Sequence, residues 1–364
     1  MQQNQSIVEF QNLMEKIGLE AVLLNTSEIT RSINLRRLSG FSGSDAGLLI
    51  TQREAHLFTD GRYKSQSGIE CPGIRIHITR NKIKSISSLI KSRGIRSVCL
   101  EGTRISYEFI STLRKKTPGI DFVNLKRSLL DDLRILKTPQ EVETIRSAAE
   151  LASDACMEII ALGLSGRAEA EVAADLENLF RRKGASGASF NTIVASGVRS
   201  ALPHGTATSK IINDGELVII DFGCRLSGYC SDETLTCIVN SDPHDKQRQI
   251  YQAVRDAHDR AIEAIRIGMK ASAVDKVARE SIAAAGFGDY FLHSLGHGVG
   301  LEVHEAPYLS PGSKDTLEYG MVFTVEPGVY LEGAGGVRLE SLIYLAENGP
   351  IILNTAPKTL IRAT

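Results

Sequence analysis

Two segments of the chain share an arrangement in which a strongly apolar run ends in an acidic residue next to a glycine. Residues 217–223 read LVIIDFG and place Asp221 at the end of the run, and residues 322–328 read VFTVEPG and place Glu326 there. Apolar runs of this length predict buried strands. Each acid should therefore lie at the margin of a hydrophobic core, where a carboxylate is costly unless a partner compensates its charge.

A second acid follows each run after a glycine-bearing turn. Asp232 follows the turn near residues 226–228, and Glu340 follows the glycine-rich turn at residues 333–336. Folded back as hairpins, the strands can bring both acids of a hairpin to one face. For the first hairpin alone, a turn-capping Asp221 and a solvated Asp232 would explain the pattern equally well. Two hairpins of the same design are hard to explain by surface solvation, and they predict an inward-facing acidic site.

Four carboxylates packed together would have strongly raised pKa values without cations between them. Two divalent metal ions about 3.5–4 Å apart, bridged by acids and a hydroxide, would resolve this. His297, in the segment GHGVG at residues 296–300, can supply a nitrogen ligand. That segment is a poor dinucleotide-binding loop, because no clear strand precedes it and no clear helix follows it. Pro307 and Tyr308 argue against a His-Glu-x-x-His zinc helix at His304, and the absence of a Gly-x-Ser-x-Gly elbow makes a serine hydrolase improbable.

The composition excludes several other classes of protein. A formal net charge of -1 gives no electrostatic reason for binding nucleic acid or an anionic membrane. The N-terminal segment lacks an uninterrupted apolar stretch, and no apolar run approaches the roughly 20 residues of a transmembrane helix. The 6 cysteines form no Cys-x-x-Cys pair and are expected to be reduced and mostly buried. We therefore expect a cytoplasmic protein that has neither nucleic acid nor a membrane as a partner.

At 364 residues the chain is long enough for two domains. Residues 1–134 alternate short apolar runs with amphipathic stretches, which predicts an α/β domain with a mixed sheet. Its expected strands span residues 21–24, 47–50, 56–58, 74–78 and 97–100, and its expected helices span residues 7–17, 83–92 and 107–116. The pattern then changes, because Thr138 can cap a helix that starts at Pro139. Residues 135–364 are assigned to the second domain.

The second domain is predicted to contain two similar halves, each of which combines helices with one acidic hairpin. Its expected helices span residues 139–162, 168–183, 246–265 and 271–285. Its expected strands span residues 189–195, 217–222, 228–239, 321–326, 329–331 and 337–345. No repeat is visible residue by residue, but this layout suggests that the two halves enclose one site.

Several ordered motifs carry a resemblance to a known family. In the second domain they read ALPHG, IDFG, SD, HSLGHGVGLEVHE, VEPG and GVRLE, at residues 201–205, 220–223, 231–232, 293–305, 325–328 and 336–340. In the first domain, GFSGS at residues 40–44 and LFTDGRY at residues 57–63 add to them. Together they closely resemble the M24 metallopeptidases, in the branch that contains prolidase (Xaa-Pro dipeptidase) and aminopeptidase P (Xaa-Pro aminopeptidase). The resemblance covers essentially the whole chain.

The resemblance implies an α+β architecture, in which a creatinase/prolidase-type α/β domain with a mixed sheet precedes a pita-bread catalytic domain. It implies two divalent metal ions, with manganese preferred over cobalt or zinc. It also implies a homodimer. The five positions of the metal ligands fall on Asp221, Asp232, His297, Glu326 and Glu340. The positions that contact substrate and the tetrahedral intermediate fall on His204, His293 and His304. Arg338 matches an arginine that stands two residues before the last ligand.

The implied reaction is hydrolysis of the Xaa-Pro bond at the N-terminus of dipeptides or longer peptides by a metal-bridging hydroxide. Glu326 would shuttle the proton, His304 would stabilise the oxyanion, and His204 would engage the leaving nitrogen or adjacent backbone. His293 and Arg338 would orient the substrate and the surroundings of the metals. Dipeptidase and aminopeptidase activity stay open as alternatives, because the branch shares these motifs. An M24 aminopeptidase of other N-terminal specificity and a non-catalytic binding protein with this fold are further alternatives.

Two positions depart from the pattern of the family. The chain has Leu235 where an arginine is common, and Ser341 where an aspartate is common after the last ligand. Our hypothesis is that these two charges were partners near the metals and were lost together, so that no buried charge is left unpaired. Restoring arginine at position 235 alone should then reduce the stability of the protein or its metal binding more than restoring both the arginine and the aspartate.

Overall fold

The computed structural model describes residues 4–125 and 127–364, and the chain divides into two compact units, Met1–Leu133 and Arg134–Thr364. Each unit is built around hydrophobic clusters of its own. Within the described ranges, no helix has both the length and the apolar character needed to cross a membrane.

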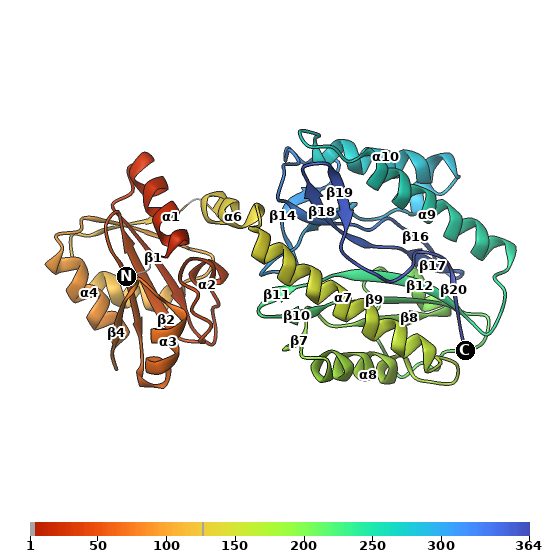
Figure 1. The fold of residues 1–364 in the computed structure, drawn as a ribbon, viewed down its shortest axis with the longest axis horizontal. Helices are drawn as coiled ribbons and strands as arrows, with labels where there is room; N and C mark the ends of the chain where they lie inside the picture. Colours follow the sequence, from red (N-terminus) through yellow and green to blue (C-terminus); the bar gives the residue numbers. More distant parts are fainter. Residues whose placement is uncertain (1–3, 126) are drawn as a thin grey trace. The chain divides into compact units, whose positions relative to one another are not determined.

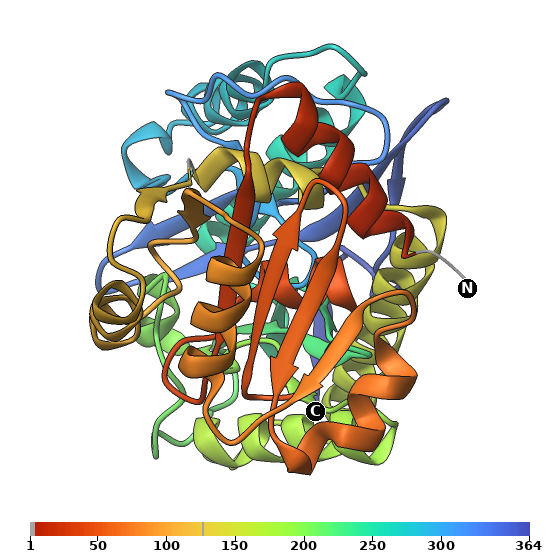
Figure 2. The same ribbon diagram turned by 90° about the vertical axis from the view of Figure 1, so that its left-hand side faces the viewer.

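The N-terminal unit contains one six-stranded sheet with the strand order β4-β3-β2-β1-β5-β6. The strands are β1 (Ala21–Thr26), β2 (Ala46–Thr51), β3 (Ala55–Thr59), β4 (Arg75–Ile78), β5 (Ser97–Leu100) and β6 (Asp121–Asn124). β1, β2 and β3 pair antiparallel, whereas β4, β5 and β6 join parallel to their neighbours. Figure 2 shows these strands side by side. The prediction of a mixed sheet is confirmed.

Helices cover both faces of this sheet. They are α1 (Gln5–Lys16), α2 (Ile33–Ser39), the 3-10 turn η1 (Gly61–Tyr63), α3 (Lys64–Glu70), α4 (Lys82–Ser92) and α5 (Tyr107–Lys116). Because side chains alternate along a strand, Leu24 joins the cluster under α1 and α2, whereas Leu23 joins the cluster under α4 and α5. Phe10 of α1 and Ile90 of α4 are fully buried on opposite faces. Helix α6 (Arg127–Ile135) then leads into the second unit.

The first half of the C-terminal unit packs α7 (Pro139–Ala161) and α8 (Glu169–Arg182) against a four-stranded sheet with the order β20-β12-β9-β8. The bounds of these strands are β8 (Ile193–Ser196), β9 (Leu217–Phe222), β12 (Glu233–Val239) and β20 (Ile361–Ala363). A smaller sheet and a 3-10 turn complete this half, with β7 (Gly187–Ala188), η2 (Gly197–Ala201), β10 (Cys224–Leu226) and β11 (Tyr229–Cys230). As predicted, Thr138 caps α7, and its hydroxyl and Glu141 form a reciprocal capping box.

The second half packs α9 (Asp245–Ala264) and α10 (Ala271–Ala284) against a five-stranded sheet with the order β14-β13-β15-β18-β19. Its strands are β13 (Gly296–Gly298), β14 (Glu305–Leu309), β15 (Val322–Val325), β18 (Ser341–Ala346) and β19 (Gly349–Ile352). A separate two-stranded ribbon and a 3-10 turn add β16 (Gly328–Leu331), β17 (Gly335–Arg338) and η3 (Gly288–Tyr290). In Figure 1, α8 and α10 lie at opposite sides of the unit, with the strands between them.

Some predicted boundaries are wrong where the backbone leaves the regular strand. The predicted strand 189–195 is interrupted, because residues 189–192 form a bend between β7 and β8. The predicted strand 337–345 is broken at Leu339 and Glu340, which separate β17 from β18. Strand β13 was missed because its sequence, Gly-His-Gly, has little intrinsic strand preference. Both interruptions adjoin residues of the site described below.

Candidate metal centre

The first acidic hairpin is formed by β9 and β12, which pair antiparallel with Asp221 opposite Thr234. Asp232 lies two positions before Thr234, so alternation places its side chain on the same face. Leu235 and Ile220 point to the other face, where they join the core under α7 and α8. Asp232 is only 4% exposed, which excludes the solvated surface role considered above. The hairpin therefore has an apolar outer face and a polar inner face.

The second pair of acids occupies breaks between strands, with Glu326 between β15 and β16 and Glu340 between β17 and β18. The backbone N–H of Glu340 donates to the carbonyl oxygen of Thr234 (3.0 Å), and the Thr234 hydroxyl donates to Glu340 Oε2 (2.7 Å). The Thr236 hydroxyl donates to the carbonyl oxygen of Arg338 (2.8 Å). Threonines of β12 thus join the two halves of the unit directly beside the acids.

His297 lies in the middle of β13, next to acids from both halves. Its Nδ1 lies 3.2 Å from the carbonyl oxygen of Gly298, which can only accept a hydrogen bond. Nδ1 therefore carries a proton, and Nε2 lies 3.3 Å from Glu326 Oε1 and 3.7 Å from Asp232 Oδ2. In the neutral ring, the Nε2 lone pair points toward these carboxylates and is available to bind a metal ion.

Two observations indicate that the four carboxylates and the imidazole fit divalent cations. The ligand atoms of Asp232, His297 and Glu340 all lie within 4.8 Å of one another. Asp221 Oδ1 is buried and has no hydrogen-bond partner within the described part of the chain, although buried carboxylate oxygens are normally satisfied. Carboxylate oxygens with one imidazole are ligands that divalent metals accept. A cation at this place would give Asp221 Oδ1 the partner that the protein does not provide.

Burial and mutual repulsion raise the pKa of three of these acids. The pKa values of Asp232 and Glu340 lie well above the usual range, because burial disfavours their charge and neighbouring carboxylates add to the effect. Burial also raises the pKa of Asp221, against the opposing influence of the Arg338 guanidinium. Without cations, the cluster therefore resists full ionisation, as its composition suggested.

Glu326 and His297 differ from these three acids, because they form an ion pair. Burial by itself would raise the pKa of Glu326 and lower that of His297. Their hydrogen bond and opposite charges outweigh burial, so the pKa of Glu326 is lowered and that of His297 is raised. Only neutral imidazole ligates a metal, so metal binding at His297 requires loss of this proton.

A chain of hydrogen bonds connects Asp221 to the far wall of the site. The buried Arg338 donates from Nη2 to Asp221 Oδ2 (2.7 Å) and from Nη1 to the hydroxyl oxygen of Tyr330 (2.8 Å). Tyr330 Oη also lies 2.9 Å from His293 Nε2, while His293 Nδ1 lies 2.8 Å from the carbonyl oxygen of Ser294. His293 Nδ1 must donate to that carbonyl, so the Tyr330 hydroxyl donates to Nε2. Burial lowers the pKa of His293 and raises that of Tyr330 to about 12, which keeps both groups neutral.

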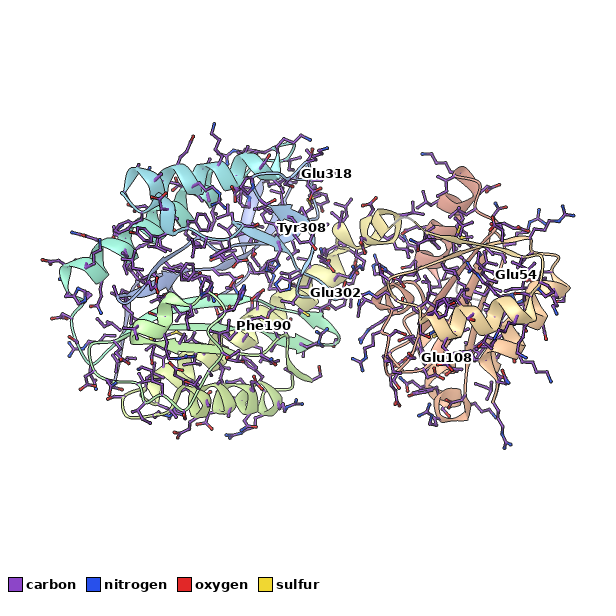
Figure 3. The ribbon with its side chains drawn as sticks, turned by 180° about the vertical axis from the view of Figure 1, so that it is seen from behind. Glu54, Glu108, Phe190, Glu302, Tyr308 and Glu318 are labelled. Carbon is purple, nitrogen blue, oxygen red and sulfur yellow. The ribbon has the colours of Figure 1, made fainter. Side chains whose placement is uncertain are left out.

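The four acids, His293, His297 and Arg338 line one cavity of about 490 Å³. Phe190, from the bend between β7 and β8, and Tyr308, from β14, line it from different halves of the unit (Figure 3). His204 and His304 are exposed side chains on its wall, and the ring of His304 meets the ring of His297 edge to face at 4.2 Å. Partial burial and the neighbouring His297 lower the pKa of His304. The cavity thus places imidazoles beside the acidic cluster.

All the site residues predicted from the sequence line this cavity. They are His204, Asp221, Asp232, His293, His297, His304, Glu326, Arg338 and Glu340. Sequence reasoning missed three hydroxyl groups that hold them, those of Thr234, Thr324 and Tyr330.

A signal for one of these residues existed in the glycine two residues before it. A Cβ atom at Gly328 would lie 2.5 Å from the Tyr330 hydroxyl oxygen, so this position must be glycine for the tyrosine to reach Arg338. The sequence alone does not reveal which side chain needs that space.

The two departures from the family pattern lie in different surroundings. Leu235 is buried in the core under α7 and α8. Ser341 lies in β18, where its Oγ is 3.0 Å from Nε2 of the buried His258 of α9. His258 Nδ1 in turn lies 2.9 Å from Asp259 Oδ1. The hypothesis that an arginine and an aspartate were lost from these positions as partners finds no support in this geometry.

The comparisons with known proteins agree with this architecture. Residues 143–347 match metallopeptidase family M24, and residues 7–136 match the creatinase/prolidase N-terminal domain. The Xaa-Pro dipeptidase of Pyrococcus furiosus is 40% identical over 336 residues, which are 92% of this chain and 94% of that protein. The structure of the Xaa-Pro dipeptidase from Bacillus anthracis has a TM-score of 0.93 at 36% identity, covering 98% of this chain and 99% of the other.

A third relative is the X-Pro aminopeptidase from Thermotoga maritima, with a TM-score of 0.91 at 35% identity over 96% of this chain and 100% of the other. The two-domain arrangement and the pita-bread fold predicted from the motifs are confirmed by these similarities. The chain therefore belongs to metallopeptidase family M24, with a creatinase/prolidase N-terminal domain.

Proposed function

We propose that this hydrolase is a dinuclear metallopeptidase that cleaves the Xaa-Pro bond at the N-terminus of dipeptides or short peptides. The observation that carries the proposal is the buried cluster of four carboxylates and one imidazole, in which Asp221 Oδ1 lacks a protein partner within the described residues. The named activities of similar proteins, Xaa-Pro dipeptidase and X-Pro aminopeptidase, support the substrate class. The residues assigned to the metal ions are Asp221, Asp232, His297, Glu326 and Glu340.

When bound, two divalent cations would supply a water that ionises near neutral pH and a Lewis acid for the scissile carbonyl. We propose manganese as the native metal, because a set of four carboxylates and a single imidazole is rich in the oxygen ligands that manganese accepts. Cobalt and zinc are the alternatives. Metal analysis of the purified protein tests this choice directly.

We propose the following catalytic roles, which the position of each group supports. Glu326 lies on the cavity wall beside His297, where its carboxylate would accept a proton from the attacking water and pass it on. His304 is neutral and stands on the cavity wall, where a ring N–H can stabilise negative charge that develops on the substrate carbonyl oxygen. His204 would engage the leaving nitrogen, while His293 and Arg338 orient the substrate and Asp221.

The apolar part of the cavity lining agrees with a proline substrate. Phe190, Ile193 and Pro203 contribute apolar lining near the acidic cluster. An Xaa-Pro bond has no N–H, and the pyrrolidine ring is rigid. A site that recognises this bond must therefore contact the ring surface, which these side chains can do.

We also propose that the protein is cytoplasmic and acts as a homodimer. The location is supported by its cysteines, all of which are unpaired and buried, as expected in a reducing compartment. The dimer rests on the family resemblance alone. Size-exclusion chromatography with light scattering tests it, and a mass of 39.6 kDa, that of one chain, would contradict it.

Hydrolysis of matched peptides tests the reaction and its length preference together. Enzyme loaded with manganese should cleave Ala-Pro, Ala-Pro-Ala or both, and should leave Ala-Ala and Ala-Ala-Ala largely intact. Preference for Ala-Pro identifies a dipeptidase, and preference for the tripeptide identifies an aminopeptidase. Removing the metal with a chelator should abolish turnover, and adding manganese should restore it. Equal cleavage of the alanine peptides would contradict the specificity, and full turnover without metal would contradict the mechanism.

A further inference from the structure

A buried ion network lies beside the segment that carries His304. Arg134 donates from Nη1 to Glu305 Oε2 (3.0 Å) and from Nη2 to Glu302 Oε2 (2.9 Å), while Lys137 Nζ donates to Glu305 Oε1 (2.9 Å). The side chains of Arg134, Lys137 and Glu305 are each at most 5% exposed. In these ion pairs two cations face two anions, and such partners are what buried charges require.

The backbone segment that carries Arg134 and Lys137 is bonded to neighbouring elements of the catalytic unit. The backbone N–H of Lys137 donates to the carbonyl oxygen of Gly320 (2.8 Å), and Leu136 forms a β-bridge with Met321, directly before β15. One residue later Thr138 caps α7. The segment 134–138 is therefore tied to both a strand and a helix of the catalytic unit.

The two anions stand on either side of His304: Glu302 lies on a segment without regular structure, and Glu305 is the first residue of β14. Residues 299–304 lie between β13 and β14. The N–H of Gly300 donates to the carbonyl oxygen of Glu302 (3.0 Å), and a Cβ atom on Gly300 would lie 2.4 Å from Glu305 Oε1. The carboxylate of Glu305 therefore lies against the start of the segment, and its position determines the path that the backbone takes to His304.

We propose that Arg134 and Lys137 are positioning residues for the hydrolytic reaction. By holding Glu302 and Glu305, they fix the backbone on both sides of His304 and keep its ring against His297 at the cavity wall. Arg134 bridges both acids with the two ends of one planar guanidinium, which the single ammonium of a lysine cannot reproduce. The proposal rests on the proposed function, because it assumes that His304 acts in catalysis.

Removing the guanidinium tests this proposal. Arg134→Met should lower kcat about 10- to 100-fold, because displacement of a catalytic group by about 1 Å costs that much. KM and the metal content should stay nearly unchanged, because Glu302 and Glu305, the acids that Arg134 binds, do not line the cavity. Arg134→Lys should recover only part of the rate. Arg248→Met is the matched control, since Arg248 is exposed on α9 and its ion pair with Asp245 is 3.9 Å long; it should behave like the wild type.

A charge-balanced variant separates loss of positioning from loss of the fold. Arg134→Met leaves an excess of buried negative charge, whereas Arg134→Met combined with Glu302→Gln removes one charge of each sign and leaves the Lys137–Glu305 pair intact. The combined variant should keep the wild-type melting temperature within a few degrees and still show the loss of kcat. A folded combined variant with unchanged kcat would overturn the proposal.

A double-mutant cycle shows whether Arg134 acts through His304. In a His304→Ala background, Arg134→Met should change kcat by less than about twofold, because the group that it positions is gone. Multiplication of the two effects, or loss of metal from Arg134→Met, would overturn the proposal while leaving the proposed function standing. If His304→Ala alone left the rate unchanged, the role of His304 and this proposal would both fail. Absence of Xaa-Pro cleavage by the wild type would instead overturn the proposed function.

Discussion

At the scale of single residues, the two carboxylate oxygens of Asp221 have opposite surroundings. Oδ2 accepts a hydrogen bond from Arg338, whereas Oδ1 is buried without a partner in the described structure. A buried acceptor that remains unsatisfied costs about 1–3 kcal/mol. Such a cost in an otherwise well-bonded site indicates that the protein alone does not complete the site.

Substituting Asp221 by asparagine tests this interpretation. Asp221→Asn keeps the volume of the side chain but removes its charge and one of its acceptor oxygens. The number of metal ions bound per chain should fall by at least one, measured by elemental analysis, and kcat should fall roughly 100-fold or more. Asp214→Asn is the control, because Asp214 lies in the turn before β9 and accepts hydrogen bonds from Ser165 and Asn240 at the surface. Wild-type metal content in Asp221→Asn would contradict its role as a ligand.

The site residues could be predicted because their chemical type is unusual where it occurs. An acid at the end of an apolar run, as at Asp221 and Glu326, is visible in the sequence because it breaks the pattern around it. Tyr330 breaks no pattern, since an aromatic residue in an apolar strand is ordinary. Its function depends on the register of β16 with β17, which pairs Gly328 with Arg338 and becomes known only from the fold.

At the scale of elements, β3 and β4 create a second cluster of titratable groups, this time in the N-terminal unit. His56 Nδ1 lies 2.9 Å from His77 Nε2, and His56 Nε2 lies 3.1 Å from Glu54 Oε2. The carboxylate must accept, so His56 donates from Nε2, and a neutral His56 then accepts from His77 at Nδ1. This arrangement requires that His56 is neutral. Burial is the largest cause that lowers the pKa of both histidines, and Arg75 lowers them further.

The stability of the N-terminal unit should therefore depend on pH. A histidine with a lowered pKa stabilises the fold above its unfolded pKa of about 6.5, and this contribution is lost as the pH falls below that value. The lowered pKa of Glu54 acts in a more acidic range, below about pH 4.5, and does not overlap with this window. Denaturant unfolding at pH 7.5 and pH 5.5 should show a lower stability at the acidic pH. His77→Gln should reduce the difference, and an unchanged difference would contradict the assignment.

Long, buried elements were predicted more accurately than short, partly exposed ones. The long apolar run at residues 217–222 and the capped helix after Thr138 were predicted with nearly correct bounds. Strand β6 and strand β14 were missed because they are short and partly exposed, so tertiary pairing rather than local pattern decides them. The bend at residues 189–192 replaces a predicted strand where Phe190 reaches the cavity.

At the scale of the whole molecule, the acidic centre belongs entirely to one of the two units. The N-terminal unit contributes none of the predicted ligands, and each unit has its own core. A ligand that binds only the native state stabilises the unit that holds it. Any stabilisation by metal should therefore be confined to unfolding of Arg134–Thr364.

Calorimetry with and without metal tests this expectation. Adding manganese at about 100 times its dissociation constant should raise the stability of the catalytic unit by about 2.7 kcal/mol per site. The transition that shifts should be the one that Asp221→Asn makes insensitive to metal. The transition of the N-terminal unit, identified as the one whose pH dependence His77→Gln reduces, should not move. Equal shifts of both transitions would contradict the independence of the units.

The hydrogen bonds between Thr234 and Glu340 have a consequence for the order of folding. Asp221 and Asp232 lie in one half of the catalytic unit, and Glu326 and Glu340 lie in the other, so the donors meet only after β12 has docked beside the second hairpin. In small zinc modules the ligands are close in sequence, and metal capture drives folding from the start. Here the metal site would form late in folding, after long-range contacts have established the topology. Metal binding would then stabilise that topology. The visible absorption of bound cobalt(II) during refolding would therefore report when the two halves of the catalytic unit come together.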